Sequence, residues 1–243
     1  MFSVDVVVVS AGSWSCSSCV VMCSHRSAGF RYRPGMADAH YFSPSPAGPL
    51  RTRTITVELG GRTVDVETAG GVFSPEHVDQ GSLVLLRNVP EPPAEGHLLD
   101  VGCGWGPVAL DLAMRSPAAT VWAVDVNERA LALTRANARS LGLENLNAVL
   151  PDDVPVDLEF AAVWSNPPIR VGKEALHGIL LDWMPRLSPG ADAWLVVQRN
   201  LGSDSLQRWL VDTLPAGLET TRAVSDKGFR VLRVHRADSR SDS

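Results

Sequence analysis

Residues 98–110, LLDVGCGWGPVAL, place three glycines between a short apolar run and a helical pattern. The run LLDV is typical of a buried strand, and the residues from Pro107 onward have helical spacing. Gly102, Gly104 and Gly106 let the backbone turn sharply and let a ligand lie against it without a Cβ in the way. Taken alone, this loop also fits a tight strand–helix turn that binds nothing.

Two carboxylates favour a ligand at this loop. Asp100 ends the first strand, and Asp125 ends the next strand signal, ATVWAVDV. A carboxylate in the second position can accept hydrogen bonds from both hydroxyls of a ribose. The spacing D-x-G-x-G-x-G differs from the G-x-G-x-x-G of dinucleotide sites, which argues against a nicotinamide dehydrogenase.

Strand and helix signals alternate on both sides of this loop. Strands are predicted at HLLDV, ATVWAVDV, LNAVL, LEFAAVW, ADAWLVVQ, LETTRAVS and GFRVLRVHR, and helices at SLVLLRNV, PVALDLAMRS, NERALALTRANARSLG, ALHGILLDWMPRL and DSLQRWLVDTL. Such alternation predicts an α/β, Rossmann-like fold with a mostly parallel sheet covered on both faces. The last two strands lack a helix between them, so we expect seven strands of which one is antiparallel.

The chain divides into four predicted parts. We expect residues 1–38 to be disordered or a non-native extension, because domain-like sequence begins after Met36, the expected natural start. Residues 39–80 are a β extension, with a hairpin at Gly60-Gly61, that leads into the substrate and cofactor site. Residues 81–236 form the core, and residues 237–243 are a polar tail.

The composition is ordinary for a globular protein, with 45% hydrophobic and 20% charged residues and a net charge of −5. This charge does not favour a protein that coats nucleic acid, but a local basic groove remains compatible with it. No apolar run reaches the roughly 18 residues of a membrane span. We therefore expect one large domain and no membrane segment.

Three of the four cysteines, Cys16, Cys19 and Cys23, lie in the first 35 residues. Their spacing is that of a metal half-site, yet no matching Cys or His cluster follows and structural zinc takes four ligands. We expect no metal. A chain otherwise nearly free of cysteine fits a reducing, cytoplasmic location.

Asn166-Pro167-Pro168 follows the strand LEFAAVW, where the ends of parallel strands line a ligand crevice. The alternative is a strand that simply ends in a proline turn. An amino group on a base or amide is a poor nucleophile, because its lone pair is delocalised. The Asn166 side-chain oxygen and a nearby backbone carbonyl could accept its hydrogens and turn the lone pair toward a methyl donor.

With these motifs the chain resembles class I S-adenosylmethionine-dependent methyltransferases. The resemblance implies that the cofactor is S-adenosyl-L-methionine and that Asp125 holds its ribose. It also implies that N-P-P methylates a planar amino nitrogen. Asp152 or Asp153 falls where that superfamily often contacts the adenine amino group, although a solvated loop carboxylate is the alternative for either. The implied cofactor-binding set is Asp100, Gly102, Cys103, Gly104, Gly106, Asp125, Asp152 and Asp153.

Further segments resemble the catalytic half of the small-ribosomal-subunit RNA guanine-N2 methyltransferase C family. The family's G-V-F-S and D-x-G-S elements are matched by Gly71, Val72, Phe73, Ser74, Asp79, Gly81 and Ser82. The chain departs from the family pattern after N-P-P, where Ile169 replaces an aromatic that stacks on the base and Arg170 replaces a His. Phe73 or Phe229 is a candidate for the missing aromatic face, and a core role is the alternative for both.

We therefore predict an N-methyltransferase with Asn166, Pro167 and Pro168 as catalytic residues and with Phe73, Ile169 and Arg170 in contact with substrate. The expected target is guanine N2 of small-subunit ribosomal RNA, as RNA or as the small ribosomal subunit. The alternatives are a glutamine amide, a small-molecule amine, or an inert cofactor- or RNA-binding module. Candidates for a basic rim that binds the RNA backbone, with solvated strand faces as the alternative, are Arg51, Arg53, Lys227, Arg230 and Arg233.

Overall fold

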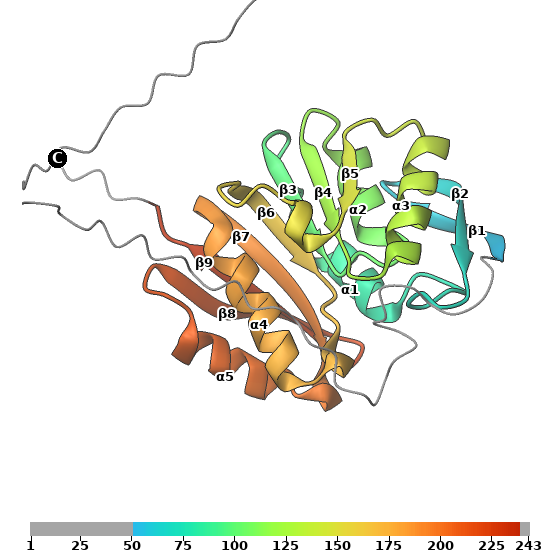
Figure 1. Ribbon diagram of the computed structural model, residues 1–243. Coiled ribbons are helices and arrows are strands. Elements are labelled where there is room, and N and C mark those ends of the chain that lie inside the picture. Colours follow the sequence, from blue (N-terminus) through green and yellow to red (C-terminus); the bar gives the residue numbers. More distant parts are fainter. Residues whose placement is uncertain (1–50, 239–243) are drawn as a thin grey trace, which may run out of the picture. The chain divides into compact units, whose positions relative to one another are not determined.

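The computed structural model describes residues 51–238 (Figure 1). In chain order its strands and α-helices are β1 (Thr52–Leu59), β2 (Arg62–Ala69), α1 (Gln80–Asn88), β3 (His97–Val101), α2 (Pro107–Arg115), β4 (Thr120–Val124), α3 (Glu128–Ser140), β5 (Leu146–Val149), β6 (Phe160–Ser165), α4 (Lys173–Trp183), β7 (Leu187–Gln198), α5 (Ser203–Thr213), β8 (Leu218–Asp226) and β9 (Phe229–Arg236). The expected extension 1–38, with Met36 and the three clustered cysteines, and the end of the tail lie outside these residues.

Seven strands form one sheet in the order β5-β4-β3-β6-β7-β9-β8. The neighbouring pairs from β5 to β7 are parallel, and β9 runs antiparallel to both β7 and β8. This confirms the predicted Rossmann-like fold, with a mostly parallel sheet and one antiparallel strand. β1 and β2 form the separate hairpin predicted around Gly60-Gly61.

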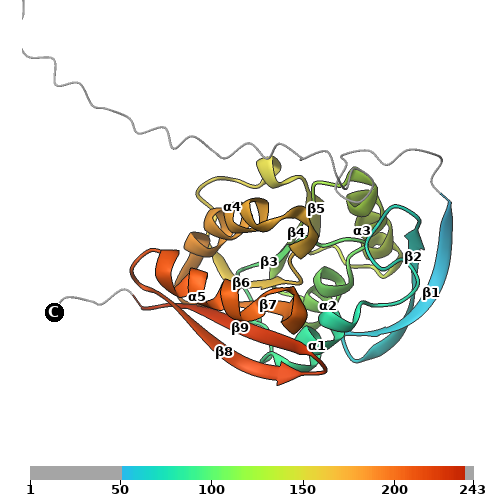
Figure 2. The same ribbon diagram turned by 90° about the horizontal axis from the view of Figure 1, so that it is seen from below.

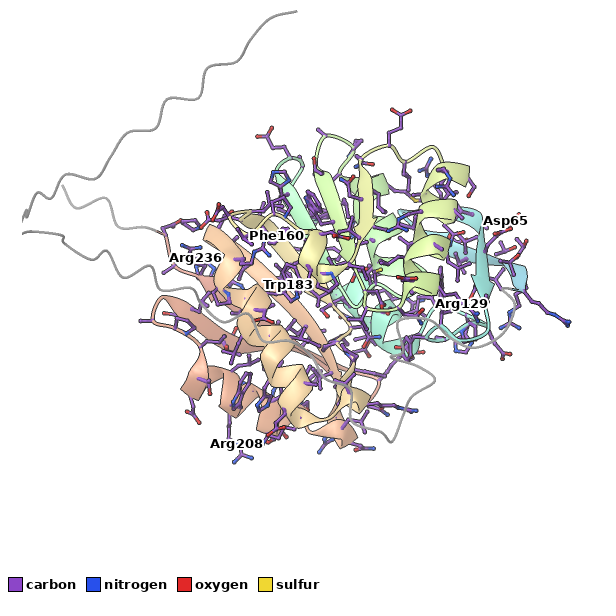
Figure 3. The ribbon with its side chains drawn as sticks, in the orientation of Figure 1. Asp65, Arg129, Phe160, Trp183, Arg208 and Arg236 are labelled. Carbon is purple, nitrogen blue, oxygen red and sulfur yellow. The ribbon has the colours of Figure 1, made fainter. Side chains whose placement is uncertain are left out.

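The two faces of the sheet are covered by different helices (Figures 1 and 2). Leu98 and its neighbours on one face pack against α1, α2 and α3, whereas Leu99 and the other face pack against α4 and α5. On the second face the rings of Phe160 and Trp183 meet edge-on, with centroids 6.1 Å apart (Figure 3). The alternation of side chains along each strand thus builds two core layers.

The chain crosses the sheet between β3 and β6. From β3 it continues outward to β4 and β5, and it then returns to the other side as β6 and β7. The Ser165 hydroxyl donates to the Val101 carbonyl oxygen at 2.6 Å and joins the two strand ends. Ligands of open α/β sheets bind at such a point, outside the carboxyl ends of the strands. The glycine loop and N-P-P both begin here.

Two predicted boundaries were wrong. The helix expected to run to Leu187 ends at Trp183, because Pro185 cannot continue it and residues 184–186 form a 3-10 turn. β7 begins at Leu187, four residues before the predicted strand, since Leu187 pairs with Phe160 ahead of an irregularity in the register. Neither change moves a residue of the glycine loop or of N-P-P.

Within residues 51–238, no helix is long and apolar enough to cross a membrane. The same part of the chain contains no group of three or more His, Cys, Asp or Glu side chains that could hold a metal ion.

Candidate active site at the switch point

The backbone of the glycine loop is held against β4. The N–H groups of Gly102 and Cys103 both donate to the Val124 carbonyl oxygen, at 2.8 and 3.0 Å. Gly102 and Gly104 have φ angles of +78° and +57°, a conformation that residues with a Cβ rarely adopt. A Cβ at Gly104 would meet no heavy atom within 4 Å. This glycine therefore borders open space above the loop.

Gly106 has a different role. Its φ is +100°, and a Cβ there would lie 3.0 Å from side-chain atoms of Thr134 in α3. Pro107 then occupies the first turn of α2, where its missing N–H costs nothing. Gly106 thus lets α2 start close to α3, whereas Gly104 leaves room for a ligand.

The open space belongs to a cleft of about 350 Å³, a volume that includes its solvent-filled mouth. The cleft is lined by Phe73, Ser74, Asp79, Ser82, Asp100, Gly102, Cys103, Gly104, Trp105, Pro107, Val108 and Asn166. The structure therefore brings Phe73, the start of the glycine loop and the Asn of N-P-P to one place.

Asp100 is almost fully buried beneath the loop, and its Oδ2 accepts a hydrogen bond of 3.0 Å from the Ala109 N–H in α2. Burial raises the pKa of Asp100 from 3.8 to about 8. The Ala109 hydrogen bond opposes this shift, and the nearby Asp125 adds to it. A buried carboxyl group with such a pKa is favourably placed for a cationic ligand, which would stabilise its charged form.

Asp125 connects the loop to the end of β4. Its two oxygens accept from the N–H groups of Gly104, at 3.0 Å, and Asn127, at 2.9 Å. Burial raises the pKa of Asp125 above its ordinary value, and the hydrogen bonds from the backbone partly offset that rise. S-adenosylmethionine carries a sulfonium and an ammonium group, so two carboxyl groups of raised pKa beside the open Gly104 fit that cofactor.

Cys103 borders the cleft but packs into the core. Its thiol lies 3.9 Å from the Thr134 hydroxyl, and burial and the two nearby carboxyl groups raise its pKa well above the ordinary value. Such a thiol is not an activated nucleophile. Trp105 is also buried, and its indole N–H donates to the Ser74 carbonyl oxygen at 3.1 Å. This bond joins the glycine loop to the loop after β2.

The side-chain amide of Asn166 is held in one orientation. Its Nδ2 donates to Asp79 Oδ2 at 2.9 Å and to the Ser82 hydroxyl at 3.1 Å. Asp79 Oδ2 also accepts from the Gly81 N–H at 2.7 Å and caps α1. A carboxylate can only accept, so the NH₂ side of the amide faces Asp79. The carbonyl oxygen Oδ1 is thereby turned away from Asp79 and is left to accept from a ligand.

The residues after Asn166 form a tight turn. Pro167 is buried, and its carbonyl oxygen accepts from the Ile169 N–H at 2.8 Å. A Cβ built on Gly102 would lie 4.0 Å from the Asn166 carbonyl oxygen and 3.5 Å from Pro168 Cδ. The backbone acceptor that faces the glycine loop is therefore that of Asn166.

The predicted substrate contacts are unequally placed. Phe73 lines the cleft and is 45% exposed. Ile169 is half-buried and packs against the core layer under α4, and Arg170 is exposed beside it. Neither of these two residues lines the cleft.

The two adenine candidates do not line the cleft either. Asp152 and Asp153 lie exposed in the 3-10 turn Pro151–Asp153 after β5. Asp152 contributes to the raised pKa of Asp182 in α4, although burial is the larger cause. A role for Asp152 or Asp153 at the adenine stays a prediction.

The sequence reasoning assigned no role to Asp79 and Ser82, although both belong to the D-x-G-S element. Phe229, which the sequence offered as an alternative aromatic face, does lie near the site: a Cβ on Gly81 would lie 3.1 Å from Phe229 Cε1 and 3.2 Å from Asn166 Nδ2. The D-x-G-S element was the available signal for Asp79 and Ser82. The sequence left open whether Phe229 belongs to the core or reaches the site, because its position depends on the β7–β9 pairing.

Comparison with known proteins agrees with this geometry. The family model "Methyltransferase small domain" matches residues 63–233. The Bacillus subtilis protein YbxB is 33% identical over 198 residues, which cover 80% of this chain and 97% of YbxB. The ribosomal RNA small subunit methyltransferase C of Ectopseudomonas mendocina is 35% identical over 79% of this chain, but the match covers only 58% of that enzyme.

Among solved structures, the T. thermophilus 16S rRNA N2 methyltransferase RsmC, in complex with AdoMet and guanosine, superposes with a TM-score of 0.66. The two sequences are 23% identical over 79% of this chain and 53% of that one, so the match supports the fold. The match to the family model extends over more than half of the chain, from the β1–β2 hairpin to β9. The chain therefore belongs to the methyltransferase small domain family and is an S-adenosylmethionine-dependent methyltransferase.

Proposed function

We propose that this chain methylates an exocyclic amino nitrogen, and that its substrate is guanine N2 in small-subunit ribosomal RNA. The observation that carries the proposal is the fixed amide of Asn166. Because Asp79 and Ser82 hold its NH₂ group, its oxygen is available to a substrate N–H at the mouth of the cleft.

The chemistry follows from two acceptors beside one methyl donor. S-adenosylmethionine supplies, when bound, an electrophilic methyl group on its sulfonium. Asn166 Oδ1 accepts one hydrogen of the substrate amino group, and the Asn166 carbonyl oxygen accepts the other. Since Pro167 O is engaged by Ile169, the two acceptors come from one residue. Held in this way, the nitrogen lone pair is directed out of conjugation with the base and toward the methyl group.

The choice of guanine N2 rests on similarity. Several relatives are named as small-subunit methyltransferases, but YbxB is not, and this chain spans only 58% of the E. mendocina enzyme and 39% of that of Shewanella amazonensis. A guanine in structured RNA would have to be flipped out of its stack. Phe73 supports this substrate, because it gives the cleft an exposed aromatic face where Ile169 does not. The ribosomal small subunit as partner and a cytoplasmic location belong to the same proposal.

The test is methyl transfer from labelled S-adenosylmethionine to three separate substrates: naked ribosomal RNA, assembled small subunits and total protein. Nucleoside mass spectrometry of ribosomal RNA from a deletion strain should show one missing N2-methylguanosine. Asn166→Ala should abolish transfer, whereas Asn147→Ala, an exposed asparagine on β5, should leave it unchanged. Label on protein with none on RNA, or cofactor binding without turnover on any substrate, would refute guanine N2 as the target.

A further inference from the structure

Charged side chains divide along the edge of the sheet that carries the cleft. At the end of β3 and after β4 and β5, the chain places carboxylates: Asp100 is the penultimate residue of β3, and Asp125, Asp152 and Asp153 follow β4 and β5. After β6, β7 and β8 it places cations, at Arg170, Lys173, Arg199 and Lys227. The division falls at the switch point between β3 and β6. One half therefore suits a cationic cofactor and the other an anionic substrate.

The four cations are exposed, and none of them forms an ion pair with another residue in the range 51–238. The nearby acids only partly balance them. Asp204 is paired with Arg222 and Arg230, and Asp226 accepts from Asn88 at 3.5 Å. Glu174 lies in the first turn of α4, where the helix dipole favours a negative charge. These four positive charges are therefore left for a partner.

The cations are connected to the catalytic amide by the backbone. The Arg199 N–H donates to the Gly228 carbonyl oxygen at 2.8 Å, so the turn after β7 and the β8–β9 hairpin move together. The next residue, Phe229, lies beside Asn166, as its position near Gly81 shows. Lys173 also lowers the pKa of His177, second to the effect of burial, which indicates positive potential above α4.

Three of the cations that the sequence suggested for a basic rim are engaged elsewhere. Arg53 pairs with Glu76, Arg230 with Asp204, and Arg233 with Asp192. Of that set, Lys227 alone lies at the turn beside the site. Neutralised cations attract phosphate less, so the binding surface is sought among the unpaired cations at this edge of the sheet.

We propose that Arg170, Lys173, Arg199 and Lys227 form a phosphate rim that binds the single RNA strand on one side of the target nucleotide. The inference rests on the proposed function, which places the target nucleotide at Asn166. From β6 to β8 the rim crosses three strand spacings, or about 14 Å, which is longer than one nucleotide. RNA is favoured over an acidic protein because the Arg199 and Lys227 turns are joined at Gly228, next to Phe229, which lies near the Asn166 amide proposed to hold a base amino group.

The test compares two double variants with the same change of charge. Arg199→Gln/Lys227→Asn removes two rim cations, and Asn suits the left-handed backbone at position 227. Arg62→Gln/Arg139→Gln removes two exposed cations at the opposite edge, by the β1–β2 turn and the end of α3. Binding of a short single-stranded RNA is measured by fluorescence anisotropy between about 50 and 200 mM salt.

For the rim variant, the slope of log K against log salt should fall in magnitude by about 1.4, at about 0.7 for each RNA phosphate that the protein no longer neutralises. The control variant should keep the wild-type slope, and both should bind S-adenosylmethionine as the wild type does. An unchanged slope in the rim variant overturns the rim even if the wild type methylates ribosomal RNA. The rim is also overturned if the rim variant loses methyl transfer to a protein substrate and the loss is the same at all salt concentrations. A reduced slope in a chain that methylates no RNA keeps the rim and refutes the proposed function alone.

Discussion

Asp79 and Asn166 are joined by a hydrogen bond of 2.9 Å, although 87 residues separate them in the chain. The same Asp79 oxygen caps α1 through the Gly81 N–H. One carboxylate thus fixes the start of a helix and the orientation of the Asn166 amide. Helix α1 therefore contributes to the candidate site by holding the amide that we propose to be catalytic.

Replacing Asp79 with Asn should separate these two roles. Asn caps helices as well as Asp, so the melting temperature should change little. An Asn at 79 can present its own NH₂, however, and Asn166 is then no longer forced to keep its oxygen toward the substrate. We expect kcat to fall, but by less than the roughly 10²–10³-fold that removal of one oriented hydrogen-bonding group from an active site costs, because Asn166 itself is kept. Ser82→Ala, which keeps the Asp79 acceptor, should have a smaller effect on kcat.

Exchanging the side chains of Asp79 and Asn166 should restore the stability and the kcat that each single substitution lowers. Asn166→Asp alone places two carboxylates within hydrogen-bonding distance, which raises the pKa of one of them and destabilises the fold. In Asp79→Asn/Asn166→Asp, the new amide donates to the new carboxylate, whose second oxygen faces the cleft. Thermal unfolding and kcat measured for both single variants and the double variant form a cycle. Additive losses in the double variant would show that the two residues act independently.

The sequence predicted the sheet and the glycine loop because both depend on local patterns. Apolar runs mark β3, β4 and β6, and Gly102 and Gly104 adopt the positive φ angles that glycine permits in a tight turn. The two boundary errors, at Pro185 and Leu187, lie far from the site. Local signals therefore sufficed for the fold and for the position of the glycine loop.

The substrate half depends on contacts between distant segments, and here the sequence was less informative. The bond from Asp79 to Asn166 depends on the packing of α1 against β7 and β9. Ile169, predicted to face the base, turns toward the core because its N–H closes a turn onto Pro167. Asp152 and Asp153 do follow β5, as the sequence predicted. The sequence does not show, however, in which direction a carboxylate in a loop points.

Gly104 and Gly106 should respond differently to a methyl group. Gly106→Ala sets a Cβ 3.0 Å from Thr134 and should lower the melting temperature. Gly104→Ala meets no atom of the chain, so its cost is limited to the left-handed backbone, roughly 1–2 kcal/mol. The added methyl instead enters the space for the cofactor. Melting temperature is measured by thermal unfolding and S-adenosylmethionine affinity by calorimetric titration. Relative to its loss of melting temperature, Gly104→Ala should lose more affinity than Gly106→Ala.

Asp100 should make the stability of the cofactor-free protein depend on pH. Its pKa in the folded state, about 8, is above the ordinary 3.8, so folding favours the neutral form. The contribution of neutral Asp100 to the free energy of unfolding is complete below pH 3.8 and is lost as the pH rises toward about 8. Asp100→Asn keeps the acceptor for Ala109 and stays neutral, so its melting temperature should fall less than that of the wild type over this range. Equal pH profiles for the two proteins would contradict the assignment.

The same pKa predicts proton release when the cofactor binds. A cationic ligand stabilises ionised Asp100, so at pH 7 binding should release up to one proton from this group. Calorimetry in buffers of different ionisation enthalpy measures that number directly. Asp100→Asn should therefore remove this proton release, and equal release in the two proteins would contradict the assignment to Asp100.

Phe73 should contribute to substrate binding through its ring. It is the large aromatic side chain exposed at the cleft, and stacking on a base is worth roughly 1–3 kcal/mol. Phe73→Leu keeps an apolar side chain but loses the ring face, so KM for RNA should rise by at least about fivefold. Phe73→Tyr should preserve KM, and S-adenosylmethionine affinity should be similar in all three proteins. If Phe73→Leu weakens cofactor binding and leaves KM for RNA unchanged, the ring contacts the cofactor and the base must stack elsewhere.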